Sequence, residues 1–236
     1  MSFKQITIWA KEFLGRKGFT LVQPFQVGWY NSEIAETYRL PNPAEDLGLL
    51  IGNTKLLWKP FMEFLSTQPS TWLMDNPHPL DTYTILVMED MRSFLASKLE
   101  LVDSNILVRY TFNMGPKMVA FQHCAHHAGL AFHNTSCGLN LHREFGPWIA
   151  LRAILVVPLA VQMVKPVLQD TLTTEQNEVV AMETKSLLEQ KQFNWRDWAN
   201  MRRHVSAFMD TDQHEYPPEM MEYHYTKNMD CLLVHQ

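Results

Sequence analysis

The sequence has few cysteines, no large excess of positive or negative charge and no long apolar run. Each of these features excludes a class of protein. Its three cysteines, Cys124, Cys137 and Cys231, are odd in number and irregular in spacing, which argues against a disulfide framework and against a structural zinc site. The formal net charge of -5 gives no reason to expect a nucleic acid or an anionic membrane as a partner. No apolar run approaches the roughly 20 residues that span a bilayer.

The N-terminal residues also lack the uninterrupted apolar stretch of a secretory signal. With so few cysteines, this predicts a soluble protein of a reducing compartment, the cytoplasm. Hydrophobic residues make up 46% of the chain and charged residues 19%, so the chain can bury a sizeable core. We expect one domain over residues 1–209, followed by a polar tail over residues 210–236 that packs on the domain or on a partner.

Hydrophobic periodicity predicts helices and strands that follow one another irregularly. Helices are expected at residues 3–15, 55–65, 81–95, 117–133 and 173–190. Strands are expected at residues 19–31, 45–53, 105–113 and 147–159. Asp81 and Thr173 are the expected N-caps of their helices. The mixture favours an α+β layer fold over a regular series of βαβ units.

One arginine interrupts the most apolar of the expected strands. Arg152 lies within the run I-A-L-R-A-I-L, where strand alternation places it on the same face as Ala150 and Ile154. A buried guanidinium needs a carboxylate or a phosphate, because an unpaired buried charge is costly. Two explanations remain open: an internal ion pair with an acid such as Glu144 or Asp197, or an acidic ligand.

Histidines cluster in the expected helix at residues 117–133. His123 and His127 are four residues apart, which is the spacing of a zinc-binding helix, but the glutamate usual between such histidines is absent. The pattern therefore favours imidazoles that bond polar atoms in the wall of a pocket, and no metal site is expected. The chain also has no Walker loop and no G-x-G-x-x-G motif to cradle nucleotide phosphates.

Four blocks of sequence, in this order, resemble a known family. They are P-F-Q-V-G-W-Y-N at 24–31, A-H-H-A-G at 125–129, L-H-R-E-F-G-P-W-I-A-L-R at 141–152 and F-N-W-R-D-W at 193–198. The resemblance is to the cblC-type family of cobalamin-processing proteins of animals, the family of methylmalonic aciduria and homocystinuria type C. It covers roughly residues 20–200.

The resemblance implies a nitroreductase-like (flavin-reductase-like) fold, an antiparallel sheet with flanking helices and a large cofactor cavity. It also implies a cytosolic enzyme and chaperone that binds cobalamin base-off and removes its upper ligand. Glutathione takes the alkyl group of alkylcobalamins, and reduced flavin (FMN or FAD) or glutathione supplies the electrons that expel cyanide from cyanocobalamin. A cblD-type adapter protein is the implied partner, and the chain itself would be a monomer or a weak homodimer.

The alternatives within this resemblance are a flavin-dependent nitroreductase-like oxidoreductase and a non-catalytic cobalamin carrier. A nitroreductase would bind flavin and reduce nitro compounds without affinity for cobalamin. A carrier would bind cobalamin and hand it on unchanged.

The resemblance also assigns site residues. Arg152 matches a family arginine that binds glutathione and is needed for function, which makes it the candidate catalytic residue, and a second glutathione arginine falls on Arg202 or Arg203. Cobalamin contacts fall on ten positions: Val119, Ala120, Phe121, Gln122, His126, His133, Asn134, Thr135, Asn140 and Leu151.

Overall fold

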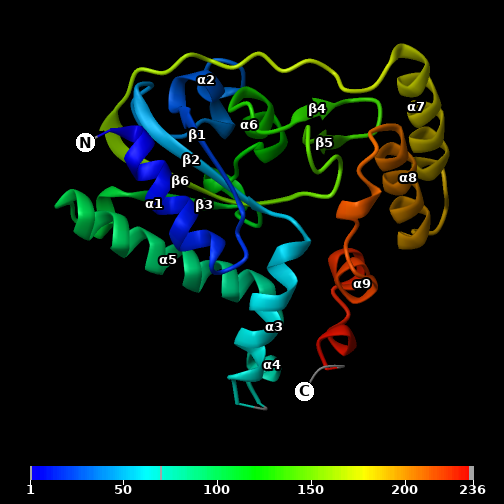
Figure 1. Ribbon diagram of the computed structural model, residues 1–236, viewed down its shortest axis with the longest axis horizontal. Coiled ribbons are helices and arrows are strands. Elements are labelled where there is room, and N and C mark those ends of the chain that lie inside the picture. Colours follow the sequence, from blue (N-terminus) through cyan, green and yellow to red (C-terminus); the bar gives the residue numbers. More distant parts are fainter. Residues whose placement is uncertain (1, 70, 234–236) are drawn as a thin grey trace.

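The computed structural model describes residues 2–69 and 71–233, and its centre is an antiparallel sheet of four strands. In spatial order the strands are β1 (Leu21–Gln26), β2 (Asp46–Asn53), β6 (Ala150–Ala160) and β3 (Leu107–Tyr110). A separate antiparallel hairpin joins β4 (Phe132–Asn134) to β5 (Leu139–Leu141). Antiparallel strands with flanking helices are thus confirmed (Figure 1).

Helices cover both faces of the sheet and extend beyond one end of it. The α-helices are α1 (Phe3–Gly15), α2 (Val27–Asn31), α3 (Trp58–Ser66), α4 (Trp72–Asp75), α5 (Pro79–Leu99), α6 (Phe121–His127), α7 (Thr174–Leu188), α8 (Trp195–Phe208) and α9 (Pro218–Thr226). Short 3₁₀ turns are η1 (Glu36–Tyr38), η2 (Lys55–Leu57), η3 (Asp103–Asn105), η4 (Gly115–Lys117), η5 (Asp212–His214) and η6 (Met229–Leu232). Figure 1 shows α1 and α5 on one face of the sheet, α2 and α6 on the other, and α7 to α9 beyond its end. None of the helices in the described ranges is long and apolar enough to cross a bilayer.

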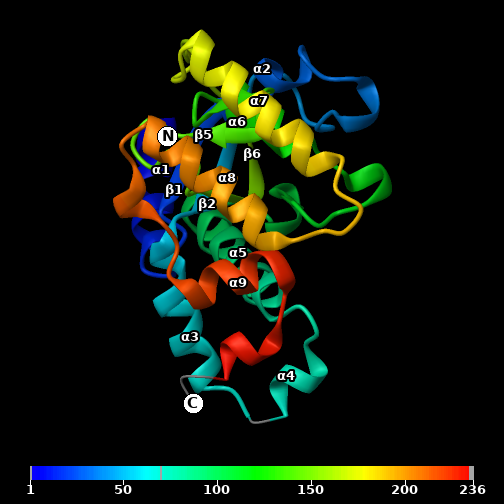
Figure 2. The same ribbon diagram turned by 90° about the vertical axis from the view of Figure 1, so that its right-hand side faces the viewer.

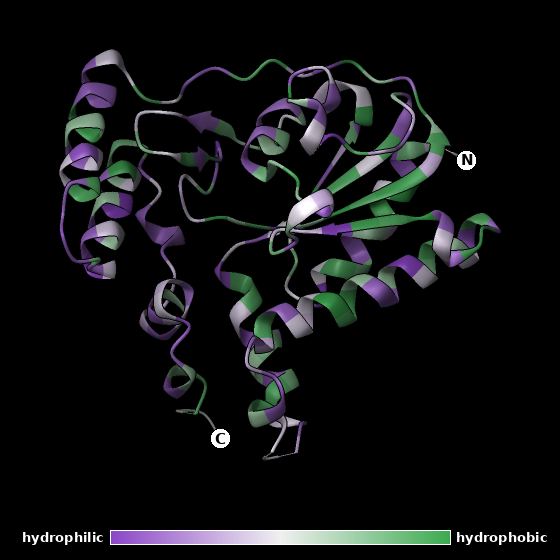
Figure 3. Ribbon diagram, turned by 180° about the vertical axis from the view of Figure 1, so that it is seen from behind, coloured by the Kyte–Doolittle hydropathy of each residue, from purple (hydrophilic) through white to green (hydrophobic). Residues whose placement is uncertain are grey.

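The central strand β2 is buried along its whole length, because helices cover it from both sides. Alternate residues of β2 enter different cores: Leu47 and Leu49 pack with α1 and α5, whereas Leu50 packs with α2 and α6. The strands of the sheet are accordingly among the most apolar parts of the molecule (Figure 3). The covered sheet therefore supports the residues at the ends of its strands.

Periodicity correctly predicts the long helices α1, α5 and α7. Thr173 caps α7 as expected, and Gln176 completes a reciprocal capping box with it. The predicted cap of α5 is wrong: His78 is the N-cap, Pro79 is the first helical residue, and Asp81 lies in the first turn.

Two other predicted elements are shorter in the structure than expected. The expected strand at 19–31 ends at Gln26, and α2 follows, because Gly28 approaches Ala44 closely and donates its backbone N–H to the Ala44 carbonyl. The expected helix at 117–133 is only α6, because Gly129 adopts φ +80° and ends it.

The C-terminal segment packs against the domain. Tyr216, Met220, Tyr223 and Leu232 are buried in the same core as α1, α3 and α5, and the ring of Tyr223 lies 6.0 Å from that of Trp58. Figure 2 shows α9 between α8 and α3. Residues 234–236, the end of the expected tail, lie outside the described residues.

A test of the sheet packing is Gly48→Ala. A Cβ at Gly48 would lie 2.3 Å from Cζ of Phe25, whose ring is fully buried against it across the strands. Because the ring has nowhere to move, we expect the free energy of unfolding to fall by about 1–3 kcal/mol, measured by denaturant titration. Gly15→Ala is the matched control, because nothing lies within 4 Å of its new Cβ. Equal stability of the two variants would contradict this packing.

Candidate functional site

A pocket of about 260 Å³ lies where β6 begins. It is lined by Thr111, Phe121, Gln122, Leu139, Asn140, Pro147, Ile149, Ala150, Leu151, Arg152, Arg202, His224 and Lys227. We call it the arginine pocket. Two arginines and a lysine line it, and none of its described lining residues is acidic. The pocket is therefore suited to an anionic ligand.

Arg152 enters this pocket through an irregularity in the sheet. The register pairs Ile51 with Ala153 but Gly52 with Leu151, so that Arg152 has no partner on β2 and forms a β-bulge. The bulge puts Leu151 in the same core as Ile154, whereas the prediction from strand alternation put them on opposite faces. That prediction was wrong because one extra residue reverses the alternation.

Arg152 has no acidic partner. Within the described ranges, no carboxylate lies within 4.0 Å of its guanidinium, so the ion pair considered with Glu144 or Asp197 is absent. Its Nε instead donates to Oδ1 of Asn53 at 2.6 Å. Burial lowers the pKa of Arg152, and nearby Asp81 partly opposes that shift, but an arginine stays charged at neutral pH.

Arg202 lies in an aromatic box. Its guanidinium carbon is 5.7 Å from the ring of Trp148, 5.9 Å from that of Tyr216 and 5.6 Å from that of Tyr225. The side chain is 7% exposed, and its Nε and Nη1 have no hydrogen-bond partner in the part of the chain that the structure describes. Such donors are costly unless a ligand or water satisfies them. The rings stabilise the cation without neutralising it.

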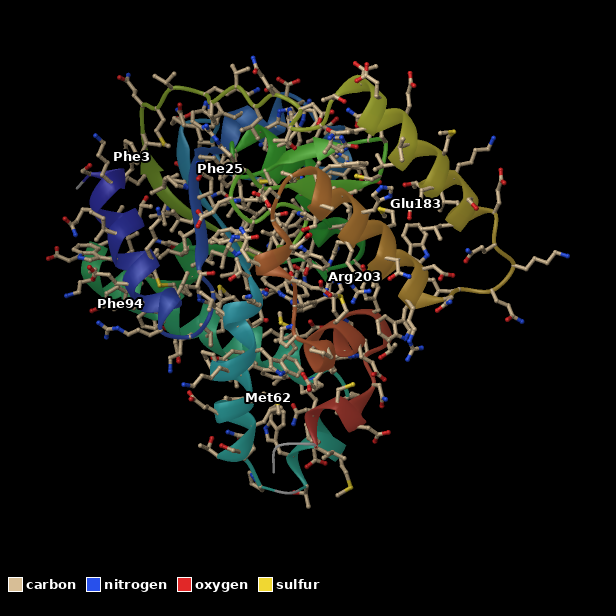
Figure 4. All side chains as sticks on the ribbon, turned by 45° about the vertical axis from the view of Figure 1, so that its right-hand side comes forward. Phe3, Phe25, Met62, Phe94, Glu183 and Arg203 are labelled. Carbon is tan, nitrogen blue, oxygen red and sulfur yellow. The ribbon has the colours of Figure 1, made fainter. Side chains whose placement is uncertain are left out.

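Arg203, the other candidate for the second glutathione arginine, lies outside the arginine pocket. It is exposed on α8, where it forms an ion pair of 2.8 Å with Glu215 and donates to Asn200. Figure 4 labels it on that helix. The structure thus brings Arg152 together with Arg202, and not with Arg203.

The C-terminal segment supplies residues that the sequence analysis did not single out. His224 on α9 and Lys227 just after it line the arginine pocket, and Nζ of Lys227 donates to the His224 carbonyl at 2.9 Å. Burial, with Arg202 and Arg152 next in effect, lowers the pKa of His224 well below its usual value. His224 and Lys227 belong to no recognisable motif. They lie close to the start of β6 only because of the way the chain folds.

Four of the ten positions expected to contact cobalamin line the same pocket. They are Phe121, Gln122, Asn140 and Leu151. Val119 and Ala120 line an adjoining pocket of about 290 Å³, which shares Thr111, Phe121 and Gln122 with the first. The two pockets therefore adjoin at the start of α6, and we call the pair the groove.

Two networks of hydrogen bonds hold the walls of this groove. The hydroxyl of Tyr30 accepts from the Ala120 N–H at 3.0 Å and donates to the Tyr38 carbonyl. The Asn140 amide donates to the Gln122 carbonyl. Tyr30, which belongs to the block at 24–31, therefore holds the backbone of Ala120 just before α6. The block at 125–129 begins within that helix.

Three other expected contacts lie away from the arginine pocket. His126 lines a different pocket together with Lys165, and its Nδ1 accepts from the His133 N–H at 3.3 Å. His133 packs edge-on against His123, with 4.9 Å between ring centroids. Thr135 is exposed in the turn between β4 and β5. No group of three or more His, Cys, Asp or Glu residues in the described segments could hold a metal ion.

Asn134 is buried, with 1% of its surface exposed. Its amide donates to the carboxylate of Asp170 and to Asn177, and its Oδ1 accepts from the N–H groups of Ser136 and Cys137. This side chain ties the hairpin to the start of α7, and its polar atoms are already used within the protein.

The comparisons with known proteins show the family and the fold of this chain. The model of the family described as "Methylmalonic aciduria and homocystinuria type C family" matches residues 18–233. The chain belongs to this family. The match includes the segment that carries His224 and Lys227, so the C-terminal part of the arginine pocket lies within the family's own span.

Relatives in vertebrates carry the name cyanocobalamin reductase / alkylcobalamin dealkylase. The zebrafish (Danio rerio) protein is 30% identical over 212 residues, which are 80% of this chain and 78% of that protein. The human protein is 28% identical over 198 residues, and the chain spans 64% of its length. The bovine relative, at 29% identity, is spanned to 65%.

A solved structure supports the fold independently. The crystal structure of the B12-trafficking protein CblC of C. elegans superposes with a TM-score of 0.76 at 20% identity, covering 97% of this chain and 94% of that one. At this identity the likeness shows the fold alone.

The arginine pocket makes stability depend on pH through His224. A histidine whose pKa is lowered by folding binds fewer protons when folded, so its stabilising contribution is present above its ordinary pKa of about 6.5 and is lost below it. We expect the melting temperature to fall less between about pH 7.5 and pH 5 in His224→Gln than in the wild type. His78→Gln, at an exposed position, is the control. An unchanged pH dependence in His224→Gln would contradict the buried neutral imidazole.

Proposed function

We propose that this protein processes vitamin B12, binding cobalamin along the groove and removing its upper ligand with glutathione held in the arginine pocket. The observation that carries the proposal is the pairing of Arg152 and Arg202, two arginines without acidic partners among the described residues, in one pocket. Glutathione carries two carboxylates, and guanidinium groups recognise carboxylates by paired hydrogen bonds. Family membership supports cobalamin as the substrate.

The size of the arginine pocket fits a small thiol better than a corrin ring. At about 260 Å³ it lies just below the roughly 300–1,000 Å³ usual for small-molecule sites, so a tripeptide suits it better than cobalamin. Cobalamin is larger than either pocket, and the family resemblance puts it against Val119, Ala120 and Phe121 of the adjoining pocket. The thiol would then face the corrin along the shared wall.

The residues of the arginine pocket would favour dealkylation in two ways. The positive charges of Arg152, Arg202 and Lys227 would lower the pKa of a bound thiol and so raise the fraction of reactive thiolate. Fixing the thiolate beside the alkyl group converts a bimolecular attack into an effectively intramolecular one. The sulfur–carbon bond forms as the cobalt–carbon bond breaks, and the electron pair of that bond stays on cobalt.

Further parts of the proposal rest on the family resemblance. They are base-off binding, reductive decyanation of cyanocobalamin with reduced FMN or FAD or glutathione as electron donor, and a nitroreductase-like fold. A cytoplasmic location, a cblD-type adapter as partner and a monomer or weak homodimer belong with them. The segment from residue 210 was expected as a polar tail that packs on the domain or on a partner. We propose that it is part of the site, because His224 and Lys227 line the arginine pocket.

The first test mixes the purified protein with methylcobalamin and glutathione without oxygen. We expect the visible spectrum to change to the base-off form, followed by S-methylglutathione in mass spectra. Tight binding of methylcobalamin without this product would show that the protein is a non-catalytic carrier. Reduction of nitro compounds by bound flavin, without affinity for cobalamin, would leave a nitroreductase.

The second test separates the arginines. We expect Arg152→Ala and Arg202→Ala each to lower kcat/KM for glutathione by about 100-fold, because a buried charge pair with a ligand carboxylate contributes about 2–5 kcal/mol. The Kd of methylcobalamin should change by less than about twofold, since in this proposal cobalamin lies mainly against the adjoining pocket, which neither arginine lines.

Arg203→Ala decides between the two candidates for the second arginine, and we expect it to keep the wild-type kcat/KM because its partner is Glu215. Arg196→Ala, on the exposed side of the same helix, is the control. If Arg203→Ala lost glutathione use and Arg202→Ala kept it, the assignment would be reversed. Equal losses of glutathione use and cobalamin binding in Arg152→Ala, with a lowered melting temperature, would favour a purely structural role.

A further inference from the structure

The one side-chain partner of Arg152 within the described residues is a neutral amide. Asn53, the last residue of β2, has no exposed surface. Its Oδ1 accepts from Nε of Arg152 at 2.6 Å, and its Nδ2 donates to the Thr54 carbonyl at 2.9 Å. Both halves of the amide are therefore used, and their orientation is settled, because an arginine has no acceptor atom.

The bulge in β6 creates this contact. Asn53 pairs with Ala150, and Gly52 comes so close to the Ala150 carbonyl that a Cβ there would lie 2.7 Å from the oxygen. Arg152 has no register partner on β2, so its side chain can reach the end of that strand, where Asn53 stands. The close approach at Gly52 and the buried amide of Asn53 are thus both part of the bulge that places the side chain of Arg152.

A carboxylate at this position would do something different. An aspartate has nearly the shape of an asparagine, but it would pair with the guanidinium and cancel most of its charge. The amide holds Nε in place and leaves the charge uncompensated, with both terminal nitrogens available for a ligand. This choice costs stability, because a buried cation is retained without a counter-ion.

We propose that Asn53 is a positioning residue that fixes Arg152 while keeping its charge free for a carboxylate of the thiol substrate. The proposal deepens the proposed function and rests on it. It makes the preference for an anionic thiol depend on one buried amide, which the family resemblance did not point to.

The test is Asn53→Asp, assayed by dealkylation of methylcobalamin. We expect the KM for glutathione to rise about tenfold or more, because the introduced carboxylate competes with that of the substrate for Arg152. At a pH high enough for the bound thiol to be fully ionised in both proteins, the kcat at saturating glutathione should stay within about twofold of the wild type, and so should the Kd of methylcobalamin. At that pH, turnover with 2-mercaptoethanol, which has no carboxylate, should not change.

The matched control is Asn200→Asp. Asn200 also accepts a hydrogen bond from an arginine, Nη1 of Arg203 at 2.8 Å, but on the exposed surface of α8. The chemical change is the same, and the pair lies outside the arginine pocket. Its KM for glutathione should equal that of the wild type.

The pH profile separates this role from a merely structural one. The charged and titratable groups around Arg152 are Asp81 on α5, Arg202 on α8, and Tyr216, Tyr223, His224 and Lys227 of the C-terminal segment. Cancelling one positive charge among them should move the pKa of the bound thiol upward, so the rise of the rate with pH shifts to higher pH in Asn53→Asp. Asn200→Asp should leave the profile in place.

A second variant covers the case in which Asn53→Asp does not fold, since it loses the bond to the Thr54 carbonyl. Asn53→Ala removes the fixed orientation but leaves the charge, so the KM for glutathione should rise by a smaller factor, with the pH profile unchanged. Wild-type KM for glutathione in either folded variant, or an equal loss with 2-mercaptoethanol, would overturn the inference alone. Absence of any glutathione-dependent product with the wild type would overturn the proposed function and the inference with it.

Discussion

The site depends on two guanidinium groups, Arg202 buried and Arg152 half-buried, that have no carboxylate partner in the part of the chain that the structure describes. Such groups are costly in a protein interior, and proteins usually pair them. Here the described residues satisfy them only in part: Arg152 by the amide of Asn53, and Arg202 by the faces of three aromatic rings. Each of these partners stabilises a cation without cancelling its charge. The two covered faces of the sheet supply the rigidity that such an arrangement needs.

This constraint explains why the C-terminal segment packs back across the chain. Two of the rings around Arg202, Tyr216 and Tyr225, belong to it, as do His224 and Lys227 of the arginine pocket. Tyr223 anchors the segment in the main core against Trp58. A chain that ended at residue 209 would leave Arg202 with Trp148 alone among these rings. The segment is thus part of the site and not an appendage to it.

The sequence predicts what depends on local patterns and misses what depends on distant contacts. The periodicity of α1 and α7 and the Thr173 cap of α7 are local, and both helices were predicted correctly. The bulge at Arg152 depends on Gly52, a hundred residues earlier, and no alternation rule could reveal it. The family resemblance found Arg152 and a choice between Arg202 and Arg203. The fold separates those two, because Arg202 lines the arginine pocket whereas Arg203 is exposed and pairs with Glu215.

An unpaired cation also links the stability of this fold to its ligand. Nε and Nη1 of Arg202 are buried donors without a partner in the described part of the chain, and each such donor costs roughly 1–3 kcal/mol when it stays unsatisfied. A ligand carboxylate that pairs with this cation would offset part of this cost, and it would do so only in the folded state. Binding to the folded state alone stabilises it by mass action. A site built this way gives up stability when empty, and in return it binds an anionic ligand more strongly than a neutral one of the same shape.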